Sequence, residues 1–142
     1  MQVIRRAQTV GAFYGFDGDA LFRLTDGSLW VQSHYKYWYH YAYRPTVEIL
    51  SERGTNFLRP EGYLEQVQVE QIFGAIESRI AGVFEGWQGE SEYELANGQV
   101  WRQRQYKYEY KYFYSPEAVV YSAPSGTVMD VEGSKSVVER VR

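Results

Sequence analysis

The chain contains one sequence pattern twice, at a fixed spacing of 71 residues. "YKYWYHYAYRP" begins at Tyr35, and "YKYEYKYFYSP" begins at Tyr106. At this spacing residues 11–50 align with residues 82–121 without a gap, and 15 of the 40 positions are identical. Chance does not produce a match of this length, so the chain is predicted to be a tandem duplication.

Most of the identical positions are glycines and aromatic residues, the types that form turns and cores. They include Gly11/Gly82, Phe13/Phe84, Gly15/Gly86, Gly18/Gly89, Leu24/Leu95, Gly27/Gly98, Trp30/Trp101, Gln32/Gln103 and Pro45/Pro116. The spacing is expected to hold as far as Val67 and Val138. We therefore predict a first repeat of residues 1–70 and a second of residues 71–142.

Each repeat has the pattern of short β-strands separated by turn residues. Strands are predicted at residues 10–16, 20–25, 28–43, 46–51, 55–60 and 65–70, with counterparts in the second repeat. Asp26-Gly27 and Asn97-Gly98 lie between alternating runs, and such dipeptides favour the type I′ turn of a two-residue hairpin. This spacing of strands favours an all-β fold, with a small antiparallel barrel or sandwich in each repeat.

One segment has a helical pattern. In residues 69–80, "VEQIFGAIESRI", apolar residues recur at helical spacing, although Gly74 weakens the pattern. Because this segment lies where the repeats join, we expect a short helical or irregular linker there.

The second repeat resembles a known type of bacterial domain. "FEGWQGESEYELANGQVWRQ" and "VMDVEGSKSVVERVR" are similar to uncharacterised bacterial domains in which a glycine-rich strand precedes an "L-NGQ-W-Q" hairpin and a final "V-RVR" strand. Those domains resemble SH3-like barrels. The resemblance implies two tandem SH3-like barrels, and it implies no activity. The first repeat departs from the pattern at "LTDGSLWVQ" and "GYLEQVQVEQI".

A tyrosine occupies every second position of the repeated stretch. In an extended strand these tyrosines share one face, and Lys36, Trp38, His40 and Ala42 take the other. A strand from Leu29 to Tyr43 would be too long for one small barrel. It is expected either to bend and serve two sheets or to project as a ribbon that pairs with the ribbon of the other repeat.

The tyrosines have three interpretations. They are a buried scaffold between the repeats, a binding surface for a protein or peptide (or for self-assembly as a homo-oligomer), or a stacking platform for single-stranded nucleic acid or glycan. We predict a non-enzymatic interaction module that uses the second of these. The candidate binding residues are Tyr35, Lys36, Tyr37, Tyr39, Tyr41 and Tyr43, with Tyr106, Lys107, Tyr108, Tyr110, Lys111, Tyr112 and Tyr114 in the second repeat.

The overall charge gives the nucleic-acid alternative little support. The net charge is −3, so binding would depend on a local patch, and "WRQRQYKYEYKY" is the best stretch because Arg102, Arg104, Lys107 and Lys111 alternate with rings. The absence of cysteine suits a reducing compartment, and no segment has the pattern of a signal peptide or a membrane span. We therefore expect a cytoplasmic protein.

No other residues form a pattern specific for chemistry. Trp30 and Trp101 are expected in the cores, and His34 and His40 as exposed side chains, since a metal site between them would lack a third ligand. Asp17–Asp19 is predicted to be a turn. We predict no catalytic residue, no metal and no cofactor, because no carboxylate pair recurs in both repeats beside a nucleophile or base.

Overall fold

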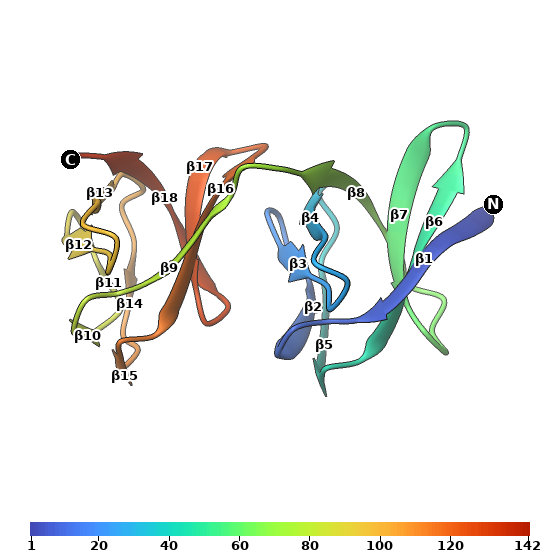
Figure 1. Cartoon of the computed structure of the whole chain (residues 1–142), viewed down its shortest axis with the longest axis horizontal. Helices are drawn as coiled ribbons and strands as arrows, with labels where there is room; N and C mark the ends of the chain where they lie inside the picture. The colour runs from blue at the N-terminus through green and yellow to red at the C-terminus, as the bar shows by residue number, and fades with distance from the viewer. The chain divides into compact units, whose positions relative to one another are not determined.

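The computed structural model describes all residues, 1–142, and every regular element in it is a β-strand. The chain forms two compact units, Met1–Phe73 and Gly74–Arg142, and each is described by itself (Figure 1). The fold is all-β, and its sheets are antiparallel, with one curved into a half-barrel. No helix is present that could cross a membrane.

The first unit contains eight strands. They are β1 Gln2–Gln8, β2 Ala12–Phe16, β3 Leu21–Arg23, β4 Leu29–Gln32, β5 Trp38–Tyr43, β6 Thr46–Glu52, β7 Thr55–Pro60 and β8 Val67–Ile72. Six of them form one sheet in the order β1-β6-β7-β8-β4-β3, and β2 pairs separately with β5. β1 was not among the predicted strands, because its sequence, QVIRRAQ, does not alternate strictly between apolar and polar residues. Its side chains are mostly exposed.

The two outer strands of this sheet meet at their ends. Thr9, just after β1, forms a β-bridge with Leu24, just after β3. Next to this bridge the Val10 N–H donates to the Arg23 carbonyl at 2.7 Å. Since the outer strands are bridged, the sheet must curve, and its concave side encloses one core.

The second unit contains ten strands. They are β9 Ile76–Arg79, β10 Val83–Phe84, β11 Trp87–Gln88, β12 Glu92–Glu94, β13 Val100–Gln103, β14 Tyr108–Glu109, β15 Phe113–Tyr114, β16 Glu117–Ala123, β17 Gly126–Val131 and β18 Ser134–Arg140. The main sheet has the order β12-β13-β18-β17-β16-β9, while β10 pairs with β15 and β11 with β14. This order matches the first unit strand for strand, and a bridge between Ile80 and Leu95 repeats the one between Thr9 and Leu24.

Each unit has its own hydrophobic core. In both units the core includes the tryptophan that follows the hairpin turn: Trp30 is 1 % exposed and Trp101 is 6 % exposed. The prediction that these two indoles are core residues is confirmed. Around them pack Phe13, Phe16, Phe22, Ile49 and Leu58 in the first unit, and Phe84, Trp87, Tyr93, Val120 and Met129 in the second.

The hairpin turns differ in type from the prediction. Gly27 and Gly98 have positive φ angles of 88° and 90°, as expected, but Asp26 and Asn97 do not share this conformation. The Gly27 N–H donates to the Leu24 carbonyl at 3.0 Å, and Leu24 N–H donates to the Ser28 carbonyl at 3.0 Å. This is a three-residue loop that ends in a left-handed glycine, so the type I′ prediction is wrong.

The helical alternative predicted for the linker at residues 69–80 is wrong, and only residues 73–75 are irregular. Val69–Ile72 belongs to β8, which pairs with β4, and Ile76–Arg79 forms β9, which pairs with β16. Gly74 between them has a φ of 77°. The helical spacing of the apolar residues was accidental, because strand pairing with distant segments overrides local pattern in so short a stretch.

The predicted long strand at residues 28–43 is two strands in different sheets. β4 ends at Gln32, the chain bends through Ser33–Tyr37, and β5 begins at Trp38. β5 pairs with β2 of its own unit. The first alternative, a bend that serves two sheets, is therefore confirmed within the first unit.

The last strand of each unit departs from the 71-residue spacing. Leu58 pairs with Val67, nine residues later, whereas its counterpart Met129 pairs with Ser136, seven residues later. The first unit therefore has two extra residues in this connection. The predicted match of Val67 with Val138 is wrong, since Ser136 is the counterpart of Val67.

Candidate functional site

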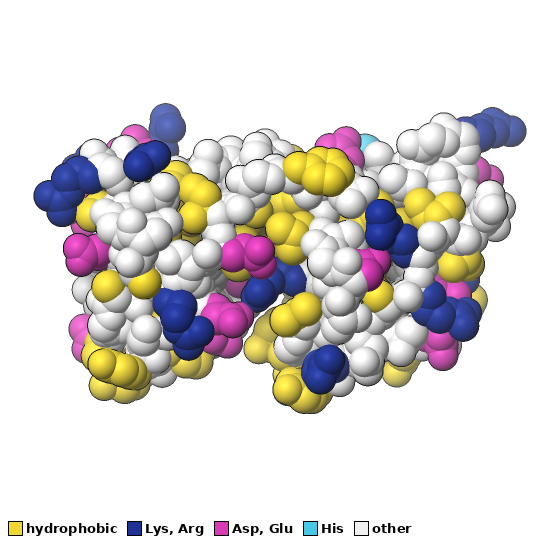
Figure 2. Space-filling model, in the orientation of Figure 1, with side chains coloured by type: hydrophobic (Ala, Val, Ile, Leu, Met, Phe, Trp, Pro, Cys, Tyr) yellow, Lys and Arg dark blue, Asp and Glu magenta, His cyan; other side chains and the backbone are white.

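The tyrosines of the repeated stretch lie at the surface of both units. We call the five tyrosines of each unit its tyrosine face: Tyr35, Tyr37, Tyr39, Tyr41 and Tyr43 in the first unit, and Tyr106, Tyr108, Tyr110, Tyr112 and Tyr114 in the second. All ten side chains are between 55 % and 80 % exposed. Figure 2 shows hydrophobic side chains at the surface near the β5 end of the first unit and the β15 end of the second.

On β5 the side chains between these tyrosines are more buried. Along β5 the exposed Tyr39, Tyr41 and Tyr43 alternate with half-buried Trp38, His40 and Ala42. The predicted alternation is confirmed for this strand. The scaffold interpretation places the tyrosines at a contact between the repeats, whereas the structure shows them exposed on their own unit.

A glycine brings β2 against β5. Gly15 has a φ of 88°, and a Cβ atom built on it would overlap the Trp38 carbonyl oxygen and lie 2.9 Å from the His40 nitrogen. Gly86 has the same relation to Glu109 in the second unit. Only a residue without a side chain allows this approach, which explains why both repeats have glycine here.

A buried glutamine holds the bend that leads into each tyrosine face. Gln32 is fully buried, and its amide nitrogen donates to the carbonyls of Asp17 (2.9 Å), His34 (2.9 Å) and Lys36 (3.1 Å). Its oxygen accepts from the Asp17 N–H at 3.0 Å.

The second unit repeats this arrangement. Gln103 donates to the carbonyls of Gln105 and Lys107, at 2.8 Å each, and accepts from the Gln88 N–H at 3.1 Å. These backbone groups would otherwise be unpaired in the bend, so the glutamine fixes the conformation of the segment that precedes the face.

Two of the three candidate lysines have structural contacts. The Lys36 ammonium donates to the Gln66 carbonyl at 2.7 Å, and Lys107 donates to the Lys135 carbonyl at the same distance. Each lysine ties the bend to the start of the last strand of its unit, since Gln66 directly precedes β8 and Lys135 is the second residue of β18. Lys111 is exposed.

The side opposite the tyrosine face differs between the units. In the first unit His40 stacks on Trp38 with ring centroids 4.9 Å apart, and Tyr63 packs against both rings. In the second unit Trp87 donates to the Ser134 hydroxyl at 2.8 Å, and that hydroxyl donates to Glu109.

Among the cationic side chains of residues 102–111, Arg102 is held in ion pairs within its own unit. Arg102 forms ion pairs with Glu92 at 3.0 Å and with Glu139 at 3.4 Å. The hydrogen bond from Arg102 to Glu92, with the charges of both carboxylates, raises the guanidinium pKa. Arg102 is therefore committed to its own unit.

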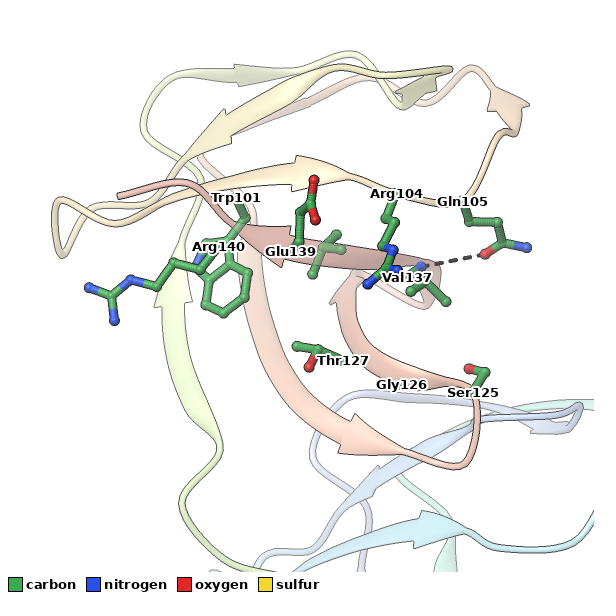
Figure 3. A pocket seen from close by; sticks show the side chains of 10 residues that line it. Trp101, Arg104, Gln105, Ser125, Gly126, Thr127, Val137, Glu139 and Arg140 are labelled. Atoms are coloured by element: carbon green, nitrogen blue, oxygen red, sulfur yellow. Dashed lines mark hydrogen bonds between the residues drawn. The ribbon is translucent and has the colours of Figure 1, made fainter.

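Arg104 lies beside an open hollow of the second unit. This hollow of about 700 Å³ is also lined by Trp101, Gln105, Thr127 and Arg140 (Figure 3). The Gln105 side chain is used within the unit, where its oxygen accepts from the Val137 N–H at 3.4 Å. In Figure 3 the Arg104 and Arg140 side chains do not converge, so no anion-binding cluster is formed.

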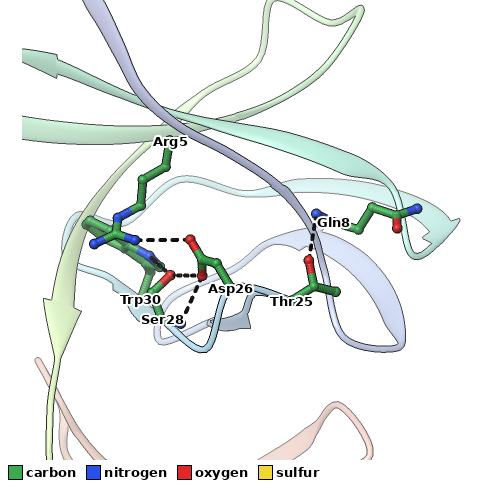
Figure 4. A network of polar contacts seen from close by, with 6 residues as sticks. All are labelled: Arg5, Gln8, Thr25, Asp26, Ser28 and Trp30. Carbon is green, nitrogen blue, oxygen red and sulfur yellow. Dashed lines mark hydrogen bonds and ion pairs between the residues drawn. The ribbon is translucent and has the colours of Figure 1, made fainter.

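A polar network supports the first hairpin turn (Figure 4). Asp26 accepts hydrogen bonds from the Ser28 N–H and hydroxyl and from Arg5, and Trp30 donates to the Ser28 hydroxyl at 2.9 Å. Burial alone would raise the Asp26 pKa, but these hydrogen bonds and the Arg5 charge lower it overall. The network positions the core indole rather than a ligand.

The histidines and the Asp17–Asp19 segment do not come together as a binding site. His34 is exposed, while His40 is half-buried in its ring stack. No group of three or more His, Asp or Glu side chains is placed to hold a metal ion. Asp17–Asp19 forms a turn, in which the Asp17 carboxylate accepts from the N–H groups of the next two residues.

The sequence did not predict that Gly15 and Gln32 position the tyrosine face. The available signal was that each is identical to its counterpart in the second repeat, Gly86 or Gln103.

Comparison with protein families, with characterised proteins and with solved structures finds no match to this chain.

Proposed function

We propose that the chain is a non-enzymatic interaction module of two tandem SH3-like barrels that binds a protein or peptide through its tyrosine faces. The observation that carries the proposal is the exposure of ten tyrosines at 55–80 %, three of them on β5, where the alternate side chains are more buried. A soluble surface seldom gathers so much aromatic area without a partner. Tyrosine offers a rigid ring and a hydroxyl, and it is enriched where proteins bind one another.

The support for the barrels and the duplication is the strand order. Both six-stranded sheets have the same order, and both are bridged between their outer strands. The absence of cysteine accords with our placement of the protein in the cytoplasm.

The rigid backbone around each face supports recognition of a defined partner. Gln32 and Lys36 fix the bend before β5, and Gly15 holds β5 against β2. A surface whose backbone is already ordered loses less entropy on binding than a flexible one.

Binding of single-stranded nucleic acid is the second candidate function, and the cations favour it less. Lys36 and Lys107 donate to backbone carbonyls, and Arg102 is paired with two glutamates. A stacking platform for nucleic acid depends on free cations beside the rings.

A pull-down from the native host, with Tyr37, Tyr39, Tyr108 and Tyr110 all changed to Ser in one chain, is expected to lose the protein that the unaltered chain captures. All four side chains are exposed, so the variant should still fold. The control is Leu64→Ser, which removes a side chain that is 89 % exposed outside the tyrosine faces and should leave capture unchanged. Equal capture by the tyrosine variant would contradict the proposal.

Titration with single-stranded oligonucleotides separates the two candidates. Our proposal predicts no binding at physiological salt. Affinity that falls steeply with added salt, and that disappears with Lys111→Ala, would favour nucleic acid instead.

A further inference from the structure

Two phenols of the second unit are held together above a glycine. The Tyr106 and Tyr108 rings are 5.3 Å apart between centroids and nearly perpendicular, at 82°. A Cβ atom at Gly89 would lie 3.0 Å from the Tyr108 hydroxyl and 3.7 Å from a ring carbon of Tyr106. Because Gly89 has no side chain, both rings can lie close to its backbone.

The Tyr106 phenol also acts on its neighbour. It is the main reason why the pKa of Tyr108 is raised, and the Glu90 charge acts in the same direction. Because the two rings pack together, each phenol has its neighbour's ring within reach when either loses an electron.

The first unit contains a matched pair without this contact. Tyr35 and Tyr37 have the same spacing and similar exposure, 80 % and 68 % against 74 % and 67 %, but their rings do not pack together. Gly18, the counterpart of Gly89, has only one ring atom within 4 Å of its Cβ position, from Tyr35 at 3.9 Å.

Other readily oxidised side chains are scarce at the surface of the second unit. The chain has no cysteine. Trp87, Trp101 and Met129 are buried in the core. An oxidant that reaches this unit therefore meets the tyrosine face first.

We propose that Tyr106 and Tyr108 are an oxidative cross-linking site, at which a haem peroxidase using hydrogen peroxide joins the two rings as dityrosine. Each phenol loses one electron and one proton and becomes a phenoxyl radical, and the peroxide takes up both electrons and both protons to form two waters. The radicals join through a carbon–carbon bond between ring positions next to the hydroxyls. The hydrogens on those two carbons move to the phenoxyl oxygens, so the chain loses two hydrogen atoms in total.

Trypsin gives a direct readout, because it cleaves after Lys107 between the two tyrosines. The full-length protein is treated with a haem peroxidase and hydrogen peroxide, digested, and analysed by mass spectrometry. A cross-link keeps peptides 105–107 and 108–111 together, with a mass lower by two hydrogens. Cleavage after Lys36 reports on Tyr35 and Tyr37 in the same sample.

The ring contact predicts about tenfold more cross-link at Tyr106–Tyr108 than at Tyr35–Tyr37, because held groups react faster than free ones. Tyr106→Phe should abolish the joined peptide, since phenylalanine forms no phenoxyl radical, while Tyr35→Phe should leave it unchanged. Equal yields at both pairs, or cross-links only between separate molecules, would overturn the proposal.

Discussion

Alanine in place of Gly15 or Gly86 is expected to unfold the unit that carries it. The new Cβ atom would overlap the Trp38 or Glu109 carbonyl oxygen, and both are backbone atoms that cannot swing away as a side chain can. The strand pair behind the tyrosine face must then separate. The loss should exceed about 4 kcal/mol in the free energy of unfolding, more than the roughly 1–3 kcal/mol of a strained φ angle alone. Thermal unfolding followed by circular dichroism measures it.

Gly11 and Gly82 provide matched controls. Each has a positive φ, 80° and 96°, but nothing lies within 4 Å of its Cβ position. Gly11→Ala and Gly82→Ala should therefore cost only the strain of the φ angle. If Gly15→Ala melts at the same temperature as Gly11→Ala, the close approach of β2 and β5 is not what requires glycine.

Glutamate in place of Gln32 is expected to cost about 3–5 kcal/mol at neutral pH, as an unpaired buried charge does. The carboxylate would have no N–H to donate to the carbonyls of His34 and Lys36, and it would repel both. Gln103→Glu should act in the same way in the second unit. Denaturant unfolding compares each variant with the unaltered chain.

The cost of Gln32→Glu should depend on pH. Burial among carbonyls raises the pKa of the new carboxyl above its unfolded value of about 4.3, so the cost is full above the folded pKa and shrinks as the pH falls through it. Gln99→Glu is the control, because Gln99 serves as an acceptor from the Trp101 indole and a carboxylate preserves that role. A difference from the unaltered chain that stays constant with pH would show that the new carboxyl is not buried.

Local features of the fold could be predicted from the sequence. The strand predicted at residues 55–60 is β7, and the tyrosines alternate with more buried side chains along β5. Both follow from a period of two residues, which depends only on neighbouring positions. The repeat spacing indicated matching turns, and Gly27 and Gly98 have the positive φ expected of them.

Features that depend on distant contacts could not be predicted. Nothing near Gln32 in the sequence indicates that its side chain holds the bend, because Asp17, whose N–H and carbonyl it binds, approaches it only in the folded unit. The split between β4 and β5 has the same origin, since β4 pairs with β8 while β5 pairs with β2. A continuous alternating pattern does not show which sheet each half joins.

The central claim is that the tyrosines are kept at the surface for recognition and contribute little to folding. Equilibrium denaturation of a chain with Tyr39→Ala and its counterpart Tyr110→Ala tests it most directly. Both side chains are more than 60 % exposed, so the unfolding midpoint should match that of the unaltered chain. A loss of stability on the scale of a truncated core aromatic, about 3–5 kcal/mol for each residue, would contradict the claim and favour the scaffold interpretation.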